Sequence, residues 1–483
     1  MLRFRKDPAR LVLVGIAWMT AFAKGLAAAE PEDRPRLIRA DPRDRIPGQY
    51  IVILDDDTLP GDSVPTVADE LLATHGGRPR VYLQNAVRGF SASLTEDQAA
   101  RLSRDPRVRL VEENARAYLS SEQALPPDDS LWHLDRVDQR TAVGSVNDKY
   151  RYCETVSNTI VYVLDTGINK KHQEFLLPNG QSRVLNGVKF ASDHHVWPGE
   201  ADDYGTYPCG GWTDNYGGGH GTSVGSLIAG KTLGIAKAAR LVPLRVFPCS
   251  GPVATVEHLC WALDWIKSPS NPTRNHRPAL VNISLRVATN QPFVAALESV
   301  INGLVLTAAG WSGIPVIASA NNQNTSQACS TPARMAYRNT AFASPGRVIS
   351  AGGTNDGDGR WKCIPGVDCV KDSGCSGGQV DVASNYGPIV DIWAPAHDIE
   401  SAHIRCASCR RTDPKMRSGT SFAAAIVSGT VARMLQTSPG LTPPQVWSGL
   451  QTDATIVTPP IDPTNGNSML LYRYGNATCT TQP

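Results

Sequence analysis

Four polar side chains lie in segments whose composition allows them to do chemistry. Asp165 ends the run TIVYVLD, His220 stands among glycines in GGGHGTS, Asn321 follows PVIASA, and Ser421 stands near the start of GTSFAAAIVSG. A carboxylate, an imidazole, an amide and a hydroxyl are groups that proteins use in nucleophilic catalysis. Taken one at a time, each has a common structural explanation, because Asp is frequent in turns and Ser at helix starts. Chemistry therefore depends on whether the fold brings them together.

Their places relative to the predicted elements favour such a meeting. Asp165 and Asn321 follow apolar runs typical of buried strands, whereas His220 and Ser421 stand where predicted helices begin. In an open parallel sheet, ligands bind and react at the edge formed by the carboxyl ends of the strands. We therefore expect all four side chains at one edge of one sheet.

The larger, second part of the chain alternates predicted strands with predicted helices. Buried strands are expected where apolar residues run almost without interruption, at 160–164, 241–247, 280–285, 314–318, 348–351 and 390–393. Helices are expected where apolar residues recur every three or four positions, the clearest being 259–266 and 294–304, with a buried helix at 422–435. Strands that are buried on both faces and separated by helices predict an α/β domain around a mostly parallel sheet.

Residues 47–119 predict a separate small α+β unit. Its patterns run strand, helix, strand, strand, helix, strand, with a capping box at Thr95 and Gln98 and a last strand at 108–112. This order is that of a ferredoxin-like fold. The polar, proline-containing stretch 120–130 that follows is interpreted as a linker.

The first 29 residues are interpreted as a signal peptide. Basic residues between positions 3 and 10 precede an apolar stretch at 11–22, and Ala27-Ala28-Ala29 offers a cleavage site of small residues. About 12 apolar residues are too few to span a bilayer, which needs about 20. We expect removal after Ala29, a secreted, extracellular protein and no stable membrane anchor.

Charge and cysteine content narrow the class of protein. The chain has 47 basic and 45 acidic residues, which provides no basic field for nucleic acid. In an exported protein its 11 cysteines predict disulfides, and the odd number leaves at least one cysteine outside an intramolecular pair. Cys406 and Cys409 lack a second closely spaced Cys/His pair, so a zinc site is not favoured. Residues 193–219 and 356–378 are interpreted as long surface loops.

The segments DTGI, HGT and SGTS, in this order along the chain, resemble the subtilisin family of serine peptidases and its proteinase K-like branch. The resemblance covers about residues 124–475, and AVRGFSASLTEDQAARLSRDPRVRLVEE is similar to the family's inhibitory propeptide. The domains we predict are a signal peptide at 1–29, a propeptide at 30–120 and a subtilisin-like peptidase domain at 121–483.

This resemblance implies a role for each of the four polar residues. His220 would accept the proton of Ser421 and return it to the leaving amine, while Asp165 fixes the imidazole tautomer. The Asn321 side-chain amide and the Ser421 backbone N–H would hold the oxyanion of the tetrahedral intermediate. The resemblance also implies a monomeric endopeptidase without a catalytic cofactor. It would act on polypeptides, and its own propeptide would inhibit it until self-cleavage.

The cleft is where the sequence departs from the family pattern. The expected substrate-binding residues are Ser250, Gly251, Ser284, Leu285 and Arg286. Arg286 stands where the family usually has glycine, and Pro252 lacks an N–H that could pair with a substrate strand. Ala320 stands where glycine usually precedes the oxyanion Asn, which would disturb Asn321 if position 320 needs a positive φ. These departures leave open an alternative: a catalytically impaired pseudo-peptidase that binds peptides without cutting them.

A structural calcium ion is a further open point. Asp391, in VDIWAPA, matches a carboxylate with which some relatives bind calcium together with backbone carbonyls. An aspartate that caps a strand is an equally simple interpretation of the same residue.

Overall fold

The computed structural model describes residues 37–40, 45–55, 63–119, 123–125, 131–138, 150, 159–190, 214, 219–248, 253–275, 278–288, 294–308, 311–326, 330–336, 348–362, 372–373, 379–380, 382–404, 415–458, 460–464, 466–467 and 469–472. All of them belong to one compact unit, Leu37–Pro483. The other unit, Met1–Arg36, and with it the predicted signal peptide, lies outside the described residues. In the part of the chain that is described, no helix combines the length and the apolar character needed to cross a bilayer.

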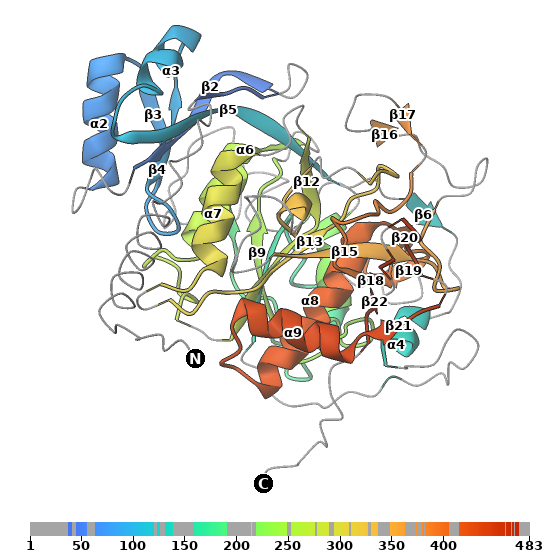
Figure 1. The fold of residues 1–483 in the computed structure, drawn as a ribbon. Coiled ribbons are helices and arrows are strands. Elements are labelled where there is room, and N and C mark those ends of the chain that lie inside the picture. Colours follow the sequence, from blue (N-terminus) through green and yellow to red (C-terminus); the bar gives the residue numbers. More distant parts are fainter. Residues whose placement is uncertain are drawn as a thin grey trace, which may run out of the picture. The chain divides into compact units, whose positions relative to one another are not determined.

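The small α+β unit predicted for residues 47–119 follows the predicted order (Figure 1). It consists of β2 (Arg45–Leu54), α2 (Val64–His75), β3 (Arg78–Leu83), β4 (Gly89–Ser93), α3 (Glu96–Leu102) and β5 (Val108–Leu119), with β1 (Leu37–Ile38) beside β5. β2 pairs with β4 and β5, and β3 pairs with β4, all antiparallel. The capping box of Thr95 and Gln98 forms, and the apolar residues of α2 and α3 pack in one core with this sheet.

Among the described residues, nine strands form a central sheet in the order β21-β22-β18-β15-β13-β11-β7-β9-β8. Every pairing is parallel except that of β21 with β22, which confirms the α/β prediction. The strands are β7 (Ile160–Asp165), β8 (Val188–Lys189), β9 (Arg240–Arg245), β11 (Ala279–Ile283), β13 (Val316–Ser319), β15 (Val348–Thr354), β18 (Ile392–Pro395), β21 (Thr455–Ile456) and β22 (Met469–Leu470).

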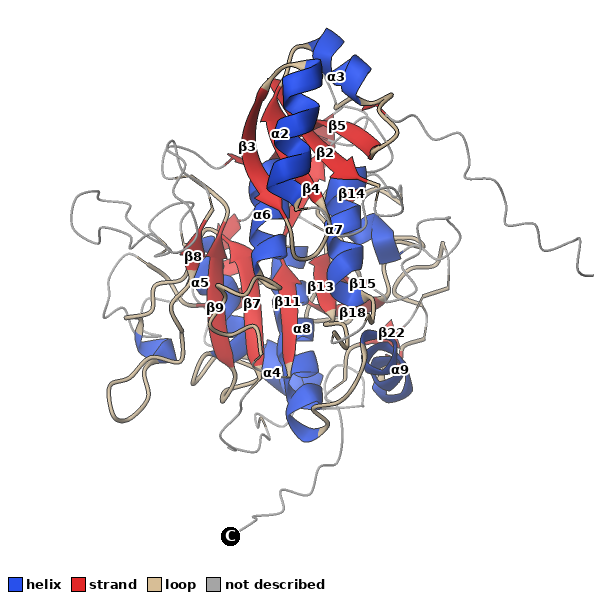
Figure 2. Cartoon of the chain, turned by 90° about the vertical axis from the view of Figure 1, so that its left-hand side faces the viewer, coloured by secondary structure: helices blue, strands red, loops and turns tan. Residues whose placement is uncertain are grey.

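Helices cover both faces of this sheet (Figure 2). They are α6 (Val256–Trp265) and α7 (Ala295–Val305) on one face, and α5 (His220–Ala229) and α8 (Thr420–Thr437) on the other. Successive residues of β7 alternate between the two cores, since Tyr162 packs in the cluster with α6 and α7 and Val163 in the cluster with α5 and α8. Burial on both faces explains why this strand is a continuous apolar run.

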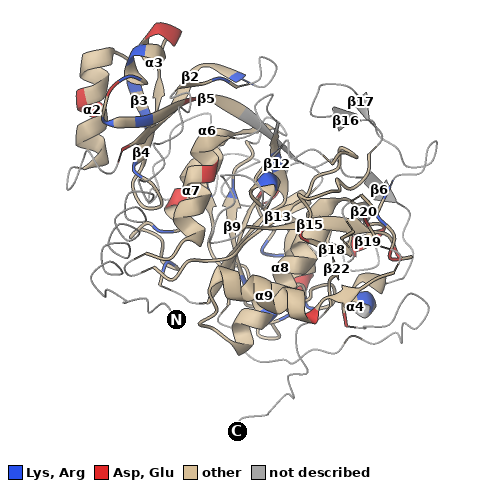
Figure 3. Cartoon of the chain, in the orientation of Figure 1, with Lys and Arg blue, Asp and Glu red and all other residues tan. Residues whose placement is uncertain are grey.

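The remaining elements are short, apart from the 11-residue helix Pro443–Asp453. They are β6 (Gln123–Leu125), α4 (Trp132–Val137), β10 (Val253–Thr255), β12 (Leu285–Ala288), β14 (Ser330–Thr331), β16 (Asp372–Ser373), β17 (Gln379–Val380), β19 (Ile399–Ser401), β20 (Lys415–Ser418), α9 (Pro443–Asp453) and the 3-10 helices Gln173–Phe175 and Ala333–Ala336. Basic and acidic residues are interspersed over the elements that Figure 3 colours.

Three predicted segments differ from the structure. The run at 280–285 is not one strand, because β11 ends at Ile283 and β12 leaves the central sheet to pair with β5 and β14. β5 does not end near residue 112 but continues to Leu119, and its last residues pair antiparallel with both β10 and β12. The supposed linker contains β6, which pairs with β20. In each case the partner strand comes from far along the chain, where local periodicity gives no signal.

Candidate active site

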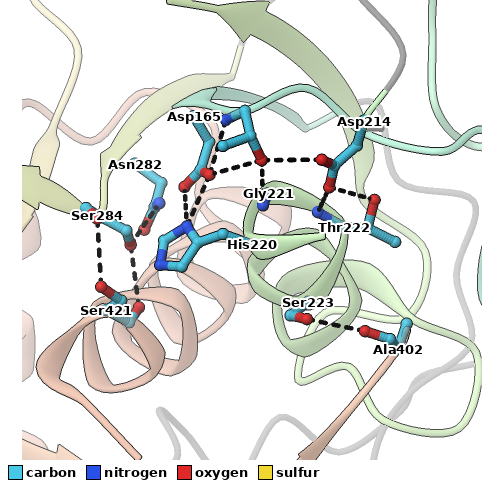
Figure 4. Close-up of polar contacts among 11 residues, drawn as sticks. Asp165, Asp214, His220, Gly221, Thr222, Ser223, Asn282, Ser284, Ala402 and Ser421 are labelled. Carbon is cyan, nitrogen blue, oxygen red and sulfur yellow. Dashed lines mark hydrogen bonds and ion pairs between the residues drawn. The ribbon is translucent and has the colours of Figure 1, made fainter. Parts of the chain in front are cut away.

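The end of β7 and the start of α5 place a carboxylate against an imidazole (Figure 4). Nδ1 of His220 lies 2.6 Å from Oδ1 and 2.8 Å from Oδ2 of Asp165, and both side chains are fully buried. Because a carboxylate only accepts hydrogen bonds, the imidazole carries a proton on Nδ1. Nε2 is then the nitrogen that can act as a base.

Glycine at position 221 allows α5 to approach the turn after Asp165. A Cβ at Gly221 would lie 2.2 Å from the carbonyl oxygen of Gly167 and 3.0 Å from the Cβ of Asp165. The Gly221 N–H also donates to the hydroxyl of Thr166 at 2.9 Å. Any larger residue at position 221 would separate the imidazole from its carboxylate.

Ser421, the second residue of α8, lies at the same edge of the sheet. Its hydroxyl donates to the carbonyl oxygen of Ser284 at 3.2 Å, and the Ser284 hydroxyl donates to the Ser421 carbonyl oxygen at 2.9 Å. In Figure 4 the imidazole of His220 lies between Asp165 and Ser421, with its second nitrogen on the side of Ser421. The structure thus brings the three side chains together, with the hydroxyl turned towards Ser284.

The start of α8 is capped by Asn322, three residues after the end of β13, rather than by Ser421. The N–H and the hydroxyl of Thr420 donate to Oδ1 of Asn322 at 3.0 and 2.8 Å, and the N-cap residue, Gly419, has no side chain to offer. Behind this start, Ala423, Ala424 and Ala425 are fully buried. The small residues let the helix lie against the sheet, so that its positive N-terminal end faces the site.

Asn321 follows β13, and its backbone turns with a φ of 74°. Its side chain is fully buried, and its backbone carbonyl oxygen accepts the backbone N–H of Asn385 at 2.8 Å. Asn is among the few residues that tolerate this left-handed conformation. Ala320 is not among the residues with positive φ, so its Cβ costs no backbone strain.

Three residues at this edge were not singled out from the sequence. They are Thr166, Asp214 and Thr222, which form a hydrogen-bonded group beside Asp165 and His220 (Figure 4). Asp214 is only 3% exposed, so the prediction of a surface loop at 193–219 is wrong for this residue. A carboxylate six positions before a helix that starts with His-Gly was the available sequence signal.

The predicted substrate-binding residues divide into two groups. Ser284, Leu285 and Arg286 lie where the chain leaves β11 for β12, and this strand pairs with β5. The Leu285 side chain belongs to the core cluster with α6 and α7, so its backbone rather than its side chain meets the paired strand. Ser250 and Gly251 lie outside the described residues.

Asp391 has the contacts of a strand cap. It is 4% exposed, and its Oδ2 accepts the N–H of Ser350 at 3.0 Å. In the described part of the chain no group of three or more His, Cys, Asp or Glu side chains could hold a metal ion. Calcium takes six to eight oxygen ligands. A site of one carboxylate and several backbone carbonyls is a different arrangement from such a group, so a structural calcium ion at Asp391 stays a prediction.

Cys260 is the cysteine that the described ranges include, and it is buried in α6 without a disulfide. Burial raises the pKa of its thiol well above the ordinary value, as do the nearby Glu112, Asp264 and Glu257. A thiol of this kind is chemically inert. The predicted disulfides fall on cysteines outside the described residues.

Comparisons with known proteins agree with this geometry. The model of the subtilase family (peptidase S8) matches residues 156–477, and that of the peptidase inhibitor I9 family matches residues 49–120. The chain is similar to an extracellular serine proteinase of Thermus sp. (strain Rt41A), with 29% identity over 469 residues that span 92% of this chain and 93% of that protein.

Solved structures give the same result. One is a cold adapted subtilisin-like serine proteinase, with 26% identity and a TM-score of 0.52 over 72% of this chain and all of that one. Another is fervidolysin from Fervidobacterium pennivorans, a keratinolytic enzyme related to subtilisin, with 18% identity and a TM-score of 0.61 over 92% of this chain and 64% of that one. The second likeness concerns the fold alone.

Proposed function

Because the chain belongs to the subtilase family and is a serine endopeptidase, we propose that it is a secreted zymogen that cuts peptide bonds with Asp165, His220 and Ser421. The observation that carries the proposal is the bond of His220 Nδ1 to both oxygens of Asp165, with Ser421 on the other side of the imidazole. Secretion is supported by the extracellular relative and by the N-terminal segment.

The proposed reaction begins when the Ser421 hydroxyl turns from the Ser284 carbonyl to Nε2 of His220. As the oxygen attacks the peptide carbonyl carbon, His220 takes the proton, and Asp165 stabilises the imidazolium. The Ser421 N–H, at the positive end of α8, and the Asn321 side-chain amide donate to the oxyanion. His220 then gives the proton to the leaving amine, and a water molecule releases the acyl group by the same steps in reverse.

A catalytically impaired peptide binder is the alternative. Its premise is that Arg286 and Pro252 obstruct the cleft, and the pairing of β5 bears on this point. β10 and β12 both pair with the last residues of β5, so neither Arg286 nor Pro252 prevents a strand from entering between them. Strand addition of this kind is a common mode of peptide recognition. A fluorophosphonate probe separates the two functions: labelling of the processed protein at Ser421 supports catalysis, and absence of labelling supports the binder.

The path of the chain past Ser421 supports self-processing. Leu119, the last residue of β5, is paired with Leu285, the residue that directly follows Ser284. The Ser284 carbonyl is the group that accepts the Ser421 hydroxyl. Gln123 of β6, four residues after Leu119, pairs with Ser418, which lies three residues before Ser421. The described residues before and after positions 120–122 are therefore paired with segments that neighbour Ser421.

The mature enzyme is expected to begin at Ser121. The predicted domain boundary lies between residues 120 and 121, and the paired residues Leu119 and Gln123 flank it. N-terminal sequencing or intact mass of the secreted, active protein measures this directly. A mature N-terminus outside positions 120–123 would show that β5 and β6 do not present the bond that is cut.

Three buried carboxyl groups hold the propeptide unit against α6 and α7. Asp264 accepts the backbone N–H groups of Gln84, Asn85 and Ala86 at 3.0, 2.8 and 2.6 Å. Oε1 of Glu257 accepts hydrogen bonds from Nε of Arg80 at 3.0 Å and from the hydroxyl of Ser91 at 2.7 Å. From the propeptide side, Glu112 of β5 accepts the N–H of Ala296 in the first turn of α7. This contact is a carboxyl group at a helix N-terminus.

Glu112 is expected to make the precursor less stable at alkaline pH. Burial, with Glu298 nearby, raises the pKa of Glu112 to about 8, against an ordinary value of 4.5. A group whose pKa is raised by folding contributes stability below the unfolded pKa, and that stability is lost as the pH rises through the folded pKa. In Ser421→Ala precursor, Tm is therefore expected to fall between about pH 5 and pH 9, whereas Glu112→Gln removes this part of the fall.

The measurement is the difference in Tm between the two precursors, S421A and S421A with E112Q, at each pH. Glutamine keeps the size of the neutral acid and can accept the same N–H, so other titrating groups cancel in the difference. A difference that does not change between pH 5 and pH 9 would show that Glu112 does not titrate in this window.

A further inference from the structure

Asp214 connects the two segments that carry Asp165 and His220. Its Oδ2 accepts the N–H of Thr222 at 2.8 Å and the Thr222 hydroxyl at 2.7 Å, both in the first turn of α5. Its Oδ1 accepts the hydroxyl of Thr166 at 3.0 Å, and Thr166 directly follows Asp165. One buried carboxylate is therefore bonded to the turn that holds Asp165 and to the helix turn that holds His220 (Figure 4).

The first of these contacts replaces a missing helix cap. The N-cap position of α5 is Gly219, which has a φ of 82° and no side chain that could accept an N–H. Asp214 supplies the acceptor from outside the helix and places a negative charge at its positive end. The orientation of the first turn, and with it of the His220 ring, depends on this carboxylate.

The second contact decides where the Thr166 proton points. The Thr166 hydroxyl accepts the Gly221 N–H at 2.9 Å, and its own hydrogen has two acceptors in reach: Oδ1 of Asp214 at 3.0 Å and Oδ1 of Asp165 at 3.3 Å. A hydroxyl has one hydrogen to donate. While Asp214 takes it, Asp165 keeps more of its negative charge for the imidazolium of His220.

Charges around Asp214 also affect the balance between the neutral and the charged form of the His220 imidazole. The pKa of Asp214 is raised above its ordinary value, because burial outweighs the bonds from Thr222 and Thr166 and the positive charge of Arg245, which lower it. Arg245 of β9 is fully buried, and its Nε donates to the Phe247 carbonyl at 3.1 Å. The titratable and charged groups that face Asp214 from β7, α5 and β9 are thus Asp165, His220 and Arg245. A second carboxylate on this side favours the charged form of the imidazole.

We propose that Asp214 is a positioning residue that aligns His220 with Asp165 and raises the basicity of His220. The inference rests on the proposed function, because it assigns Asp214 a part in preparing that same site. Asp214 acts through Thr166 and Thr222 and contacts neither the substrate nor Ser421.

The test is the pH profile of Asp214→Asn in the processed enzyme. The amide removes a negative charge and offers an N–H to Thr166, whose hydrogen then turns to Asp165, so both effects lower the pKa of His220. The acid limb of the pH profile of kcat/KM is expected to shift to lower pH, by roughly half a pH unit or more. Misalignment of His220 is expected to lower kcat about tenfold, with KM unchanged. Asp214→Glu, which keeps the charge, is expected to restore the acid limb.

A matched control is available in Glu174, another buried carboxylate outside the site. It accepts the N–H and the hydroxyl of Thr232 at 3.0 and 2.5 Å and the N–H of Leu233 at 3.1 Å, the same kind of donors that Asp214 has. Glu174→Gln is expected to lower Tm while leaving the pH profile and kcat unchanged. An Asp214→Asn profile equal to that of the wild type, with only Tm lowered, would overturn the inference.

Two further measurements keep the outcomes distinct. All rates are normalised to sites titrated with the fluorophosphonate, so a wild type that is not labelled contradicts the proposed function itself. If Asp214→Asn is not obtained folded, Thr222→Val removes one donor of Asp214 and retains the charge. Its kcat per titrated site is expected to fall about threefold at constant KM. A kcat equal to that of the wild type would then overturn the inference.

Discussion

Replacing Ser421 by alanine is expected to lower kcat about a millionfold and to leave the precursor uncut. Without the hydroxyl no acyl-enzyme can form, and loss of the nucleophile alone has an effect of this size in subtilisin. The same serine is proposed to cut the bond after position 120, so the secreted product should keep its propeptide. Hydrolysis of a peptide substrate and the size of the product on a gel measure the two effects separately.

Ser428→Ala is the matched control for this variant. Ser428 lies two turns further along α8, is fully buried, and donates to Oδ1 of Asn282 at 2.9 Å. Asn282 in turn donates to the Ser284 hydroxyl at 3.0 Å, so the replacement tests the same helix and its hydrogen bonds while it leaves Ser421 and His220 in place. This variant should be trimmed and active. An S421A precursor that is trimmed at the same bond by the purified protein alone would show that processing does not use Ser421.

Removal of the Asn321 side chain is expected to lower kcat by about a hundredfold to a thousandfold, with little change in KM. The amide is proposed to bind the oxygen only when it carries charge, and loss of such a donor costs about 3 kcal/mol of transition-state stabilisation in subtilisin. Because the backbone of Asn321 has a φ of 74°, alanine at this position adds strain that glycine does not add.

Comparison of Asn321→Ala with Asn321→Gly separates the two causes. Both lack the amide, so both should lose the same factor in kcat, whereas only the alanine variant should lose about 1 kcal/mol of stability to the left-handed backbone. Asn324 provides a control, since it also has a positive φ, of 51°. Its side-chain Oδ1, however, accepts a hydrogen bond from the Arg360 guanidinium. Asn324→Gly should keep its kcat. A glycine variant at 321 with wild-type kcat would remove Asn321 from the oxyanion site.

Some of the departures from the family pattern have a structural explanation. The Cβ of Ala320 is harmless because the backbone turns at Asn321, one position later. Pro252 precedes β10, which still pairs with β5 from Val253 onwards. Nothing in the described residues explains why arginine stands at position 286.

From the amino-acid order alone, most strands of the central sheet, its main helices and the chemical types at their ends can be predicted. Continuous apolar runs predict strands buried on both faces, and such strands alternating with helices predict a parallel sheet, because both follow from burial along a single segment. The capping box at Thr95 and the helix starting at His220 were readable for the same reason: their determinants lie within a few residues of each other.

Which distant groups meet becomes visible only in the folded chain. Three contacts join residues from separate parts of the chain: the bond of Thr166 to the buried Asp214, the cap that Asn322 provides for α8, and the mutual bonds of Ser284 and Ser421. The extension of β5 between β10 and β12 has the same origin, since its partners lie more than a hundred residues away. Hydrogen bonds of this kind depend on three-dimensional proximity, which leaves no periodic trace in the order of amino acids.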